Sequence, residues 1–263
     1  MKLSFCLEML YPELSFIDRL NEAKKDGITY FEFWDWRDKD LSALKQRMDQ
    51  LGMKVCNFSG NRNYGMIDPT ERDSFLAEVR ETGAVAKQLG CPALMLLVQS
   101  LEKDNSGRLP SIKMSDQEVE KNIIECGQEV GKIGDELDLD IVIEPLNDVL
   151  DHPNYVLTSA SKAFQIIRAI GHPRVKVLFD IYHIAMQGED VFKHIENNFD
   201  GIGYFHVADK PGRNEPGSGT IDYVKIYELL KRLGNEKVVG FEYMPSTNDS
   251  TAAVKKTLEI FSD

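Results

Sequence analysis

Three carboxylates and one imidazole stand directly after hydrophobic segments in the second half of the chain. They are Glu144 after IVI, Asp180 after VKVLF, His206 after GYF and Glu242 after VVGF. A charged group at the end of an apolar strand costs free energy unless it is paired or bound to a cation. Because three neighbouring acids also repel one another, the four residues together favour a shared divalent cation. For any one of them alone, a capped or salt-bridged strand end explains the position equally well.

The donor types predict which cation would bind. Three carboxylates and one imidazole suit Mn²⁺, Mg²⁺ or Co²⁺, whereas structural zinc sites are richer in sulfur and nitrogen. Such a cation would act as a Lewis acid on a substrate with a carbonyl beside a hydroxyl, and would stabilise an enediolate. One glutamate would remove the proton α to the carbonyl, and a second acid–base group would return a proton. Return to the adjacent carbon gives an isomerase, and return to the opposite face of the same carbon gives an epimerase.

Eight segments typical of strands alternate with eight segments of helical spacing, at about 33 residues a unit. The expected strands span residues 3–9, 28–34, 53–58, 93–98, 139–144, 175–180, 202–206 and 238–242. The expected helices span residues 14–25, 41–51, 71–89, 116–137, 159–170, 191–198, 223–233 and 251–261. This alternation predicts an α/β protein, a (β/α)8 TIM barrel that forms a single domain over residues 1–263.

The barrel places the candidate residues, because its active sites lie at the C-terminal ends of the strands. Glu144, Asp180, His206 and Glu242 end the expected fifth to eighth strands. An open doubly wound sheet is the alternative, and it would predict a glycine-rich phosphate-binding turn after the first strand. The chain has Glu8-Met9-Leu10-Tyr11-Pro12 there, which argues against that alternative.

Composition and charge disfavour several other classes of protein. The 263 residues carry a net charge of −12 without a long run of Lys and Arg, which argues against binding to nucleic acid. We find no apolar stretch long enough to cross a membrane, and the N-terminal segment lacks the apolar core of a signal peptide. The four cysteines form no CxxC pair, so we expect free buried thiols and a cytoplasmic protein.

Four motifs carry a resemblance to a known family. They are IEPLN at Ile143–Asn147, DIYH at Asp180–His183, HVADKPGRNEPGSGTIDY at His206–Tyr223 and FEYMP at Phe241–Pro245. In this order they resemble the xylose-isomerase-like TIM-barrel superfamily, and within it the branch of hydroxypyruvate isomerases and ketose 3-epimerases. The specific part of the resemblance covers about the last 120 residues, and the N-terminal half matches more loosely.

The resemblance implies roles for particular residues. It implies that Glu144, Asp180, His206 and Glu242 bind the metal, and that Glu144 and Glu242 also form the acid–base pair. His183 and Arg213 match positions that contact substrate oxygens. From the residues alone, His183 could instead be a core histidine and Arg213 a solvated loop charge. We also assign Asn147 to the substrate site, where it could orient the carboxylate of Glu144 or serve as a turn residue. For Trp34 and Trp36, core packing is favoured over substrate stacking.

The sequence is compatible with more than one class of substrate. The favoured function is a metal-dependent isomerase of a small hydroxy-carbonyl sugar or keto acid, similar to hydroxypyruvate isomerase. That branch often has Gln where this chain has His206, and commonly Glu where this chain has Thr220. A ketose 3-epimerase, or a dehydratase of the inosose or dehydroshikimate kind, would use the same site. A non-catalytic sugar-binding barrel and a trinuclear zinc endonuclease are disfavoured, the latter because no histidine precedes His152. A homo-oligomer is possible.

Overall fold

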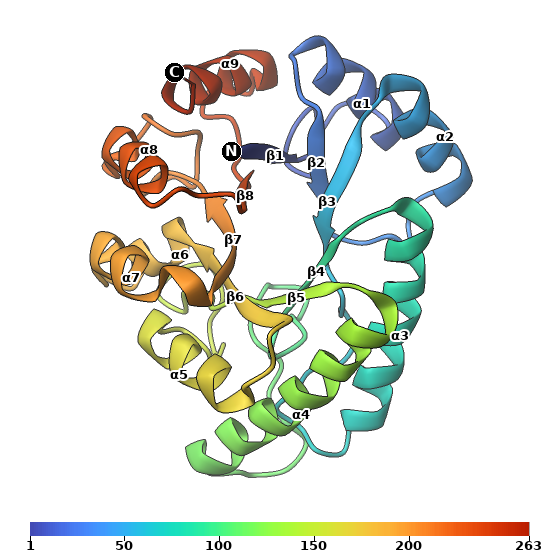
Figure 1. Ribbon diagram of the computed structural model, residues 1–263, viewed down its shortest axis with the longest axis vertical. Helices are drawn as coiled ribbons and strands as arrows, with labels where there is room; N and C mark the ends of the chain where they lie inside the picture. Colours follow the sequence, from blue (N-terminus) through green and yellow to red (C-terminus); the bar gives the residue numbers. More distant parts are fainter. Residues whose placement is uncertain (263) are drawn as a thin grey trace. The chain divides into compact units, whose positions relative to one another are not determined.

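The computed structural model describes residues 1–262, in which eight strands alternate with helices along the chain (Figure 1). Contacts divide the chain into two units, which we call unit 1 and unit 2. Unit 1 combines Met1–Cys56 with the residues from Phe205 onward, and unit 2 is Asn57–Tyr204. Both boundaries fall inside strands, namely β3 (Lys54–Phe58) and β7 (Ile202–Val207).

Unit 1 is built on parallel strands that pair in the order β2–β1–β8–β7. Its other elements are β1 (Lys2–Cys6), α1 (Phe16–Lys25), β2 (Tyr30–Phe33), α2 (Leu41–Leu51), α8 (Tyr223–Arg232), β8 (Val238–Phe241) and α9 (Ser250–Ile260). The register pairs Cys6 with Glu32 and Val207 with Phe241. Residues that follow β8 therefore lie at the same edge of the sheet as the end of β7.

Unit 2 has the parallel strand order β4–β5–β6. Its elements are α3 (Arg72–Leu89), β4 (Ala93–Leu96), α4 (Asp116–Leu137), β5 (Asp140–Ile143), α5 (Ala160–Ile170), β6 (Val175–Asp180), α6 (Ile181–Met186), α7 (Val191–Asn198) and the short 3-10 helix η1 (Phe199–Gly201). Leu96 pairs with Ile143, and Ile143 pairs with Val177, so the C-terminal ends of these strands are also aligned.

Local chemistry explains why the elements begin and end where they do. Ser115 starts α4 with a reciprocal capping box to Glu118, which satisfies backbone N–H groups at the first turn of the helix. Gly90 ends α3 in the left-handed conformation at φ 72°, which a residue with a Cβ adopts only at a cost. Most residues of the strands are apolar and buried, as expected for parallel strands covered by helices.

Almost all expected boundaries lie within two residues of the observed ones, with one larger difference and one additional α-helix. The first strand was expected to reach residue 9, but β1 ends at Cys6 because the guanidinium of Arg19 donates to the carbonyls of Leu7 and Glu8. The additional helix α6 was not expected, and it begins where the carboxylate of Asp180 caps its first turn.

Two other expectations concern the whole chain. All four cysteines are free and buried, as predicted. Among the described residues, no helix has both the length and the apolar character needed to cross a membrane.

Candidate functional site

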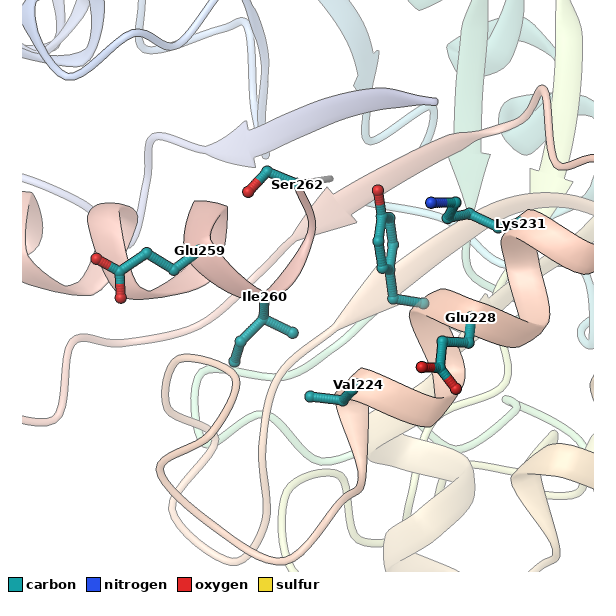
Figure 2. A pocket seen from close by; sticks show the side chains of 7 residues that line it. Val224, Glu228, Lys231, Glu259, Ile260 and Ser262 are labelled. Carbon is teal, nitrogen blue, oxygen red and sulfur yellow. The ribbon is translucent and has the colours of Figure 1, made fainter.

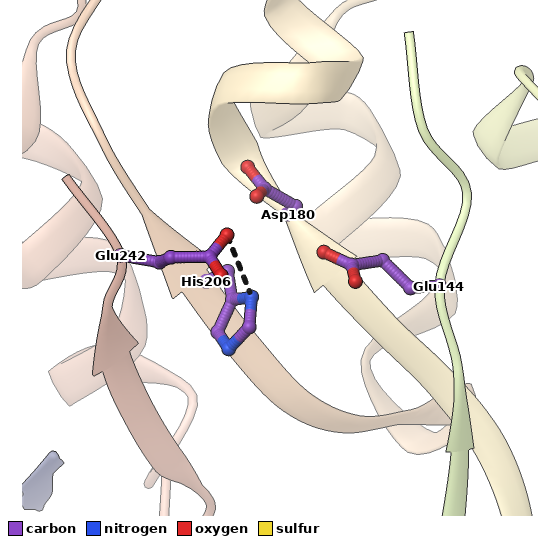
Figure 3. Close-up of side chains that lie close together, drawn as sticks. All are labelled: Glu144, Asp180, His206 and Glu242. Carbon is purple, nitrogen blue, oxygen red and sulfur yellow. Dashed lines mark ion pairs between the residues drawn. The ribbon is translucent and has the colours of Figure 1, made fainter. Parts of the chain in front are cut away.

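Unit 1 supplies His206, inside β7, and Glu242, immediately after β8. The backbone N–H of Glu242 donates to the carbonyl of Val207, which fixes Glu242 beside the end of β7. Both side chains are buried, and the Nδ1 of His206 lies 3.8 Å from the Oε2 of Glu242. Figure 3 draws the four candidate ligands and marks this ion pair with a dashed line.

The carboxylate of Glu242 is held at both oxygens. The indole Nε1 of Trp34 donates to Oε1 at 2.7 Å, and the Nη2 of Arg213 donates to Oε2 at 2.5 Å. Burial opposes ionisation of this carboxyl, but the charges of Arg213 and His206 and the indole N–H together hold the pKa of Glu242 below its usual value. Glu242 is therefore ionised at neutral pH, the state that a cation ligand or a general base requires.

Arg213 lies in the loop between β7 and α8, with a left-handed backbone at φ 52°. Its side chain is about one-fifth exposed and is paired with Glu242, so it is no solvated loop charge. The buried carboxylate of Asp209 organises this loop by accepting the backbone N–H groups of Lys210, Gly217, Gly219 and Ile221. At Gly219 a Cβ would lie 2.0 Å from the carbonyl oxygen of Lys210, so only glycine fits there.

Glu32, in β2, faces His206 from the other side. Its Oε1 lies 3.3 Å from the Nε2 of His206, and both side chains are almost completely buried. The two nitrogens of this imidazole therefore face two different carboxylates, Glu32 and Glu242.

Unit 2 supplies Glu144, directly after β5, and Asp180, the last residue of β6. The Oδ1 of Asp180 accepts the backbone N–H groups of Tyr182 and His183, at 2.7 and 3.1 Å, and so caps α6. The backbone of Glu144 is fixed by its N–H bond to the carbonyl of Leu96, and its own carbonyl accepts the hydroxyl of Tyr155. Both carboxylates are buried.

His183 is completely buried, and its Nδ1 faces Asn147. The Nδ2 of Asn147 lies 2.7 Å from this nitrogen, and the backbone N–H of Asn147 donates to it at 3.3 Å. An imidazole nitrogen that faces two amide donors acts as the acceptor, which puts the proton of the neutral ring on Nε2. That Nε2 lies 3.7 Å from the Oδ2 of Asp180.

Asn147 also closes a turn, because its Oδ1 accepts the backbone N–H groups of Leu150 and Asp151. The turn-residue interpretation of Asn147 is thus confirmed. Its side chain orients His183, and a direct contact between Asn147 and the substrate stays a prediction.

Two residues that support the site, Trp34 and Glu32, were missed or misjudged from the sequence. Trp34 is 37% exposed and donates to Glu242, so the expectation that it packs in the core was wrong. Glu32 could have been found from an acid inside the apolar strand YFEF, the same signal that identified Glu144. Asp209, which follows β7 in the stretch YFHVAD, is predicted from the sequence to hold the loop after this strand, and its four backbone hydrogen bonds confirm that prediction.

The groove in Figure 2 does not belong to the candidate site. It lies in unit 1 between α8 and α9, has a volume of about 500 Å³ and contains none of the predicted site residues. Its lining is Val224, Tyr227, Glu228, Lys231, Glu259, Ile260 and Ser262.

Comparison with protein families and sequences identifies relatives of the chain. A family model described as the xylose isomerase-like TIM barrel matches residues 20–263. Hydroxypyruvate isomerase of Escherichia coli is 27% identical over 258 residues, which cover 94% of this chain and 95% of that protein. The 2-oxo-tetronate isomerase of Cupriavidus necator is 25% identical, with 93% of each chain covered. The expectation of an isomerase or epimerase agrees with these names.

Comparison with solved structures gives the same fold. D-psicose 3-epimerase from Clostridium cellulolyticum H10 has a TM-score of 0.82 at 17% identity, and all of both chains is covered. At this identity the likeness concerns the fold alone. Together with the family match, it confirms the predicted TIM barrel, with eight parallel strands and helices between them.

Proposed function

Since the chain belongs to the xylose isomerase-like TIM barrel family, we propose that it is a divalent-metal-dependent isomerase of a small hydroxy-carbonyl substrate. The observation that carries the proposal is the buried carboxylate of Glu242, held by Trp34 and Arg213 beside His206. The proposal treats residues 1–263 as one barrel domain with its active site at the C-terminal ends of the strands.

Glu144, Asp180, His206 and Glu242 are the proposed metal ligands (Figure 3). They form a group of buried side chains with one possible ligand atom each. The barrel fold supports the grouping, because it brings the ends of its strands to one face. Three carboxylates and one imidazole fit Mn²⁺, Mg²⁺ or Co²⁺. When bound, the cation would supply Lewis-acid polarisation of a substrate carbonyl.

The side chains of the chain itself would move the protons. Glu144 and Glu242 are the proposed acid–base pair, one removing the proton α to the carbonyl and the other returning a proton. His183 would donate from Nε2, the nitrogen that Asn147 leaves protonated, to a substrate oxygen that becomes negative. Arg213 offers a guanidinium fork that matches a substrate carboxylate, as in a hydroxy-keto acid.

A three- or four-carbon hydroxy-carbonyl acid is the proposed substrate class. The names of the two isomerase relatives support it, as does the guanidinium of Arg213. Ketose 3-epimerase is the second candidate, and it is favoured by His206, which stands where hydroxypyruvate isomerases often have Gln. The four buried free thiols fit a cytoplasmic location.

A substrate panel in D₂O tests the proposal. The purified protein with Mn²⁺ is offered hydroxypyruvate, ketopentoses, ketohexoses and inosose, and products and deuterium are followed by NMR. We expect isomerisation of the keto acid, with deuterium at one α carbon. Inversion of a ketose at C3 would instead support the epimerase. A chelator should abolish turnover, and Mn²⁺ or Mg²⁺ should restore it; full activity in demonstrably metal-free protein would refute the metal role.

A further inference from the structure

We propose that Lys39 is a positioning residue for Trp34, and that it acts through the carboxylate of Glu8. Trp34 is the residue whose indole donates to Glu242. The effect on turnover rests on the proposed function, in which Glu242 is a metal ligand and an acid–base group. All four residues belong to unit 1.

Lys39 lies in the loop between β2 and α2, and its side chain is only 4% exposed. Its Nζ lies 2.6 Å from the Oε1 of Glu8, and it packs over the rings of Phe16 and Phe33, at 4.3 and 5.3 Å from their centroids. It also lies 2.9 Å from the Oδ1 of Asp38, a mostly exposed carboxylate. An ammonium withdrawn from water in this way has lost its hydration, so it holds its carboxylate partner more firmly than a surface lysine does.

Glu8 receives the backbone donor of Trp34 at the point where the pairing of β1 with β2 stops. The N–H of Leu7 donates to the carbonyl of Glu32, and in a continued parallel ladder the carbonyl of Leu7 would accept the N–H of Trp34. The guanidinium of Arg19 instead donates to that carbonyl at 2.8 Å, and the N–H of Trp34 donates to the Oε1 of Glu8 at 3.4 Å. A side chain therefore takes over from the strand in holding the backbone of Trp34.

The same oxygen of Glu8 accepts from both Lys39 and Trp34. The ammonium thus fixes the acceptor to which the Trp34 backbone is bound. Trp34 needs this support because its side chain is 37% exposed, so packing alone does not hold the indole 2.7 Å from Glu242. Without the charge of Lys39, the carboxylate of Glu8 is free to turn toward Arg19, whose Nη1 lies 3.9 Å from Oε2. The indole would then lose its alignment.

The indole N–H resonance of Trp34 reports this hydrogen bond directly. The chain has two tryptophans, so in a Trp36→Phe background ¹H–¹⁵N spectra of metal-free protein show a single indole resonance, that of Trp34. Lys39→Met keeps a long, unbranched side chain over the two phenylalanine rings and removes the charge. We expect the indole proton to move upfield in this variant, because its hydrogen bond to Glu242 weakens. An unchanged resonance would overturn the proposal.

Two further variants in the same background control this test. Glu8→Gln breaks the ion pair from the other partner at almost constant side-chain size, and it should move the resonance in the same direction even if Lys39→Met does not fold. Lys45→Met is the matched control, because Lys45 is also paired with a carboxylate, that of Asp49, but both side chains are exposed. It should leave the resonance where it is. An equal shift in Lys45→Met would show that any lost lysine charge moves the signal, and would overturn the proposal.

Turnover supplies the second measurement. We expect Lys39→Met to lower kcat by about three- to tenfold, the size of effect that follows from a weakened hydrogen bond to Glu242. In Trp34→Phe, which has no indole N–H, the same substitution should change kcat by less than about twofold, because both residues act through one hydrogen bond. Equal losses in the two backgrounds would show that Lys39 affects turnover by a route other than Trp34, and would overturn the proposal.

The two measurements separate this inference from the proposed function. If the wild type turns over none of the offered substrates, the proposed function fails, and the indole resonance still decides whether Lys39 positions Trp34. If the resonance moves in Lys39→Met while kcat stays within about twofold of the wild type, the link between Lys39 and turnover is refuted.

Discussion

The two units hold their candidate ligands by different means. In unit 2, Asp180 is fixed by backbone N–H groups at the start of α6, and Glu144 is fixed through its own backbone by Leu96 and Tyr155. In unit 1, the backbone of Glu242 is likewise fixed by Val207, but its carboxylate is also held by the side chains of Trp34 and Arg213. Backbone donors thus hold the carboxylate of Asp180, whereas side-chain donors hold the carboxylate of Glu242.

Because of this difference, we expect mutations in the two units to affect stability and chemistry to different extents. A residue that caps a helix contributes to folding as well as to the site, because its loss leaves backbone N–H groups without partners. Indole and guanidinium donors aimed at one carboxylate affect mainly the charge and orientation of that group. We therefore expect unit 1 variants to lose affinity or rate at nearly constant stability, and some unit 2 variants to lose both.

The largest expected effect is on turnover, and it should be shared by both units. Glu144→Gln and Glu242→Gln each remove a proposed acid–base carboxylate while keeping the shape of the side chain. We expect kcat to fall by about 10³-fold, within the range for general acid–base groups. Steady-state kinetics with saturating Mn²⁺ measures the loss, and circular dichroism checks the fold. Full activity in either variant would contradict the acid–base assignment.

Asp180 offers the sharpest contrast between stability and cation binding. Asp180→Ala removes both a ligand and the cap of α6, so we expect weaker Mn²⁺ binding and a loss of about 0.5–2 kcal/mol in unfolding free energy. Asp180→Asn keeps a good capping residue and should lose the affinity alone. Urea unfolding and Mn²⁺ titration measure the two quantities.

His206→Gln is the unit 1 counterpart of these variants. It should weaken Mn²⁺ binding by an amount similar to that in Asp180→Asn, at nearly unchanged stability. If Asp180→Ala and Asp180→Asn have equal unfolding free energies, the cap of α6 contributes nothing measurable to stability. The expected difference between the two units would then be absent.

The sequence predicted the order of elements and the four candidate ligands, because strand periodicity and the barrel rule place strand ends without tertiary detail. Arg213 and His183 came from resemblance, and their partners Glu242 and Asn147 needed the folded loops. The hydrogen bond from Trp34 to Glu242 could not be predicted, since it joins residues 208 positions apart and leaves no local pattern. Helix α6 was missed because its start depends on Asp180, which was read only as a ligand.

Trp34→Phe tests the side-chain donors that hold Glu242 in unit 1, and its expected effect is of intermediate size. It removes the indole N–H that donates to Glu242 and keeps an aromatic ring. We expect kcat to fall by about tenfold, equivalent to about 1.4 kcal/mol, which is close to the lower end of the range for a hydrogen bond to a charged group. Trp36→Phe is the matched control, since Trp36 packs against the guanidinium of Arg37, and it should keep the wild-type kcat. Equal kcat values in the two variants would remove Trp34 from the network.

The smallest expected effect concerns Asp68, a unit 2 carboxylate held, like Asp180, by backbone donors. Burial raises its pKa, but hydrogen bonds from Ser111 and Thr70 lower it more, from 3.8 to about 2. A carboxyl whose folded pKa is depressed stabilises the fold above its unfolded pKa, and this contribution disappears as the pH falls toward the folded value. The difference in unfolding free energy between wild type and Asp68→Asn should therefore be constant above about pH 5 and shrink between about pH 4 and pH 2. Urea unfolding at a series of pH values measures it. A difference that does not change with pH would show that these hydrogen bonds stabilise the fold equally well whether Asp68 is charged or neutral.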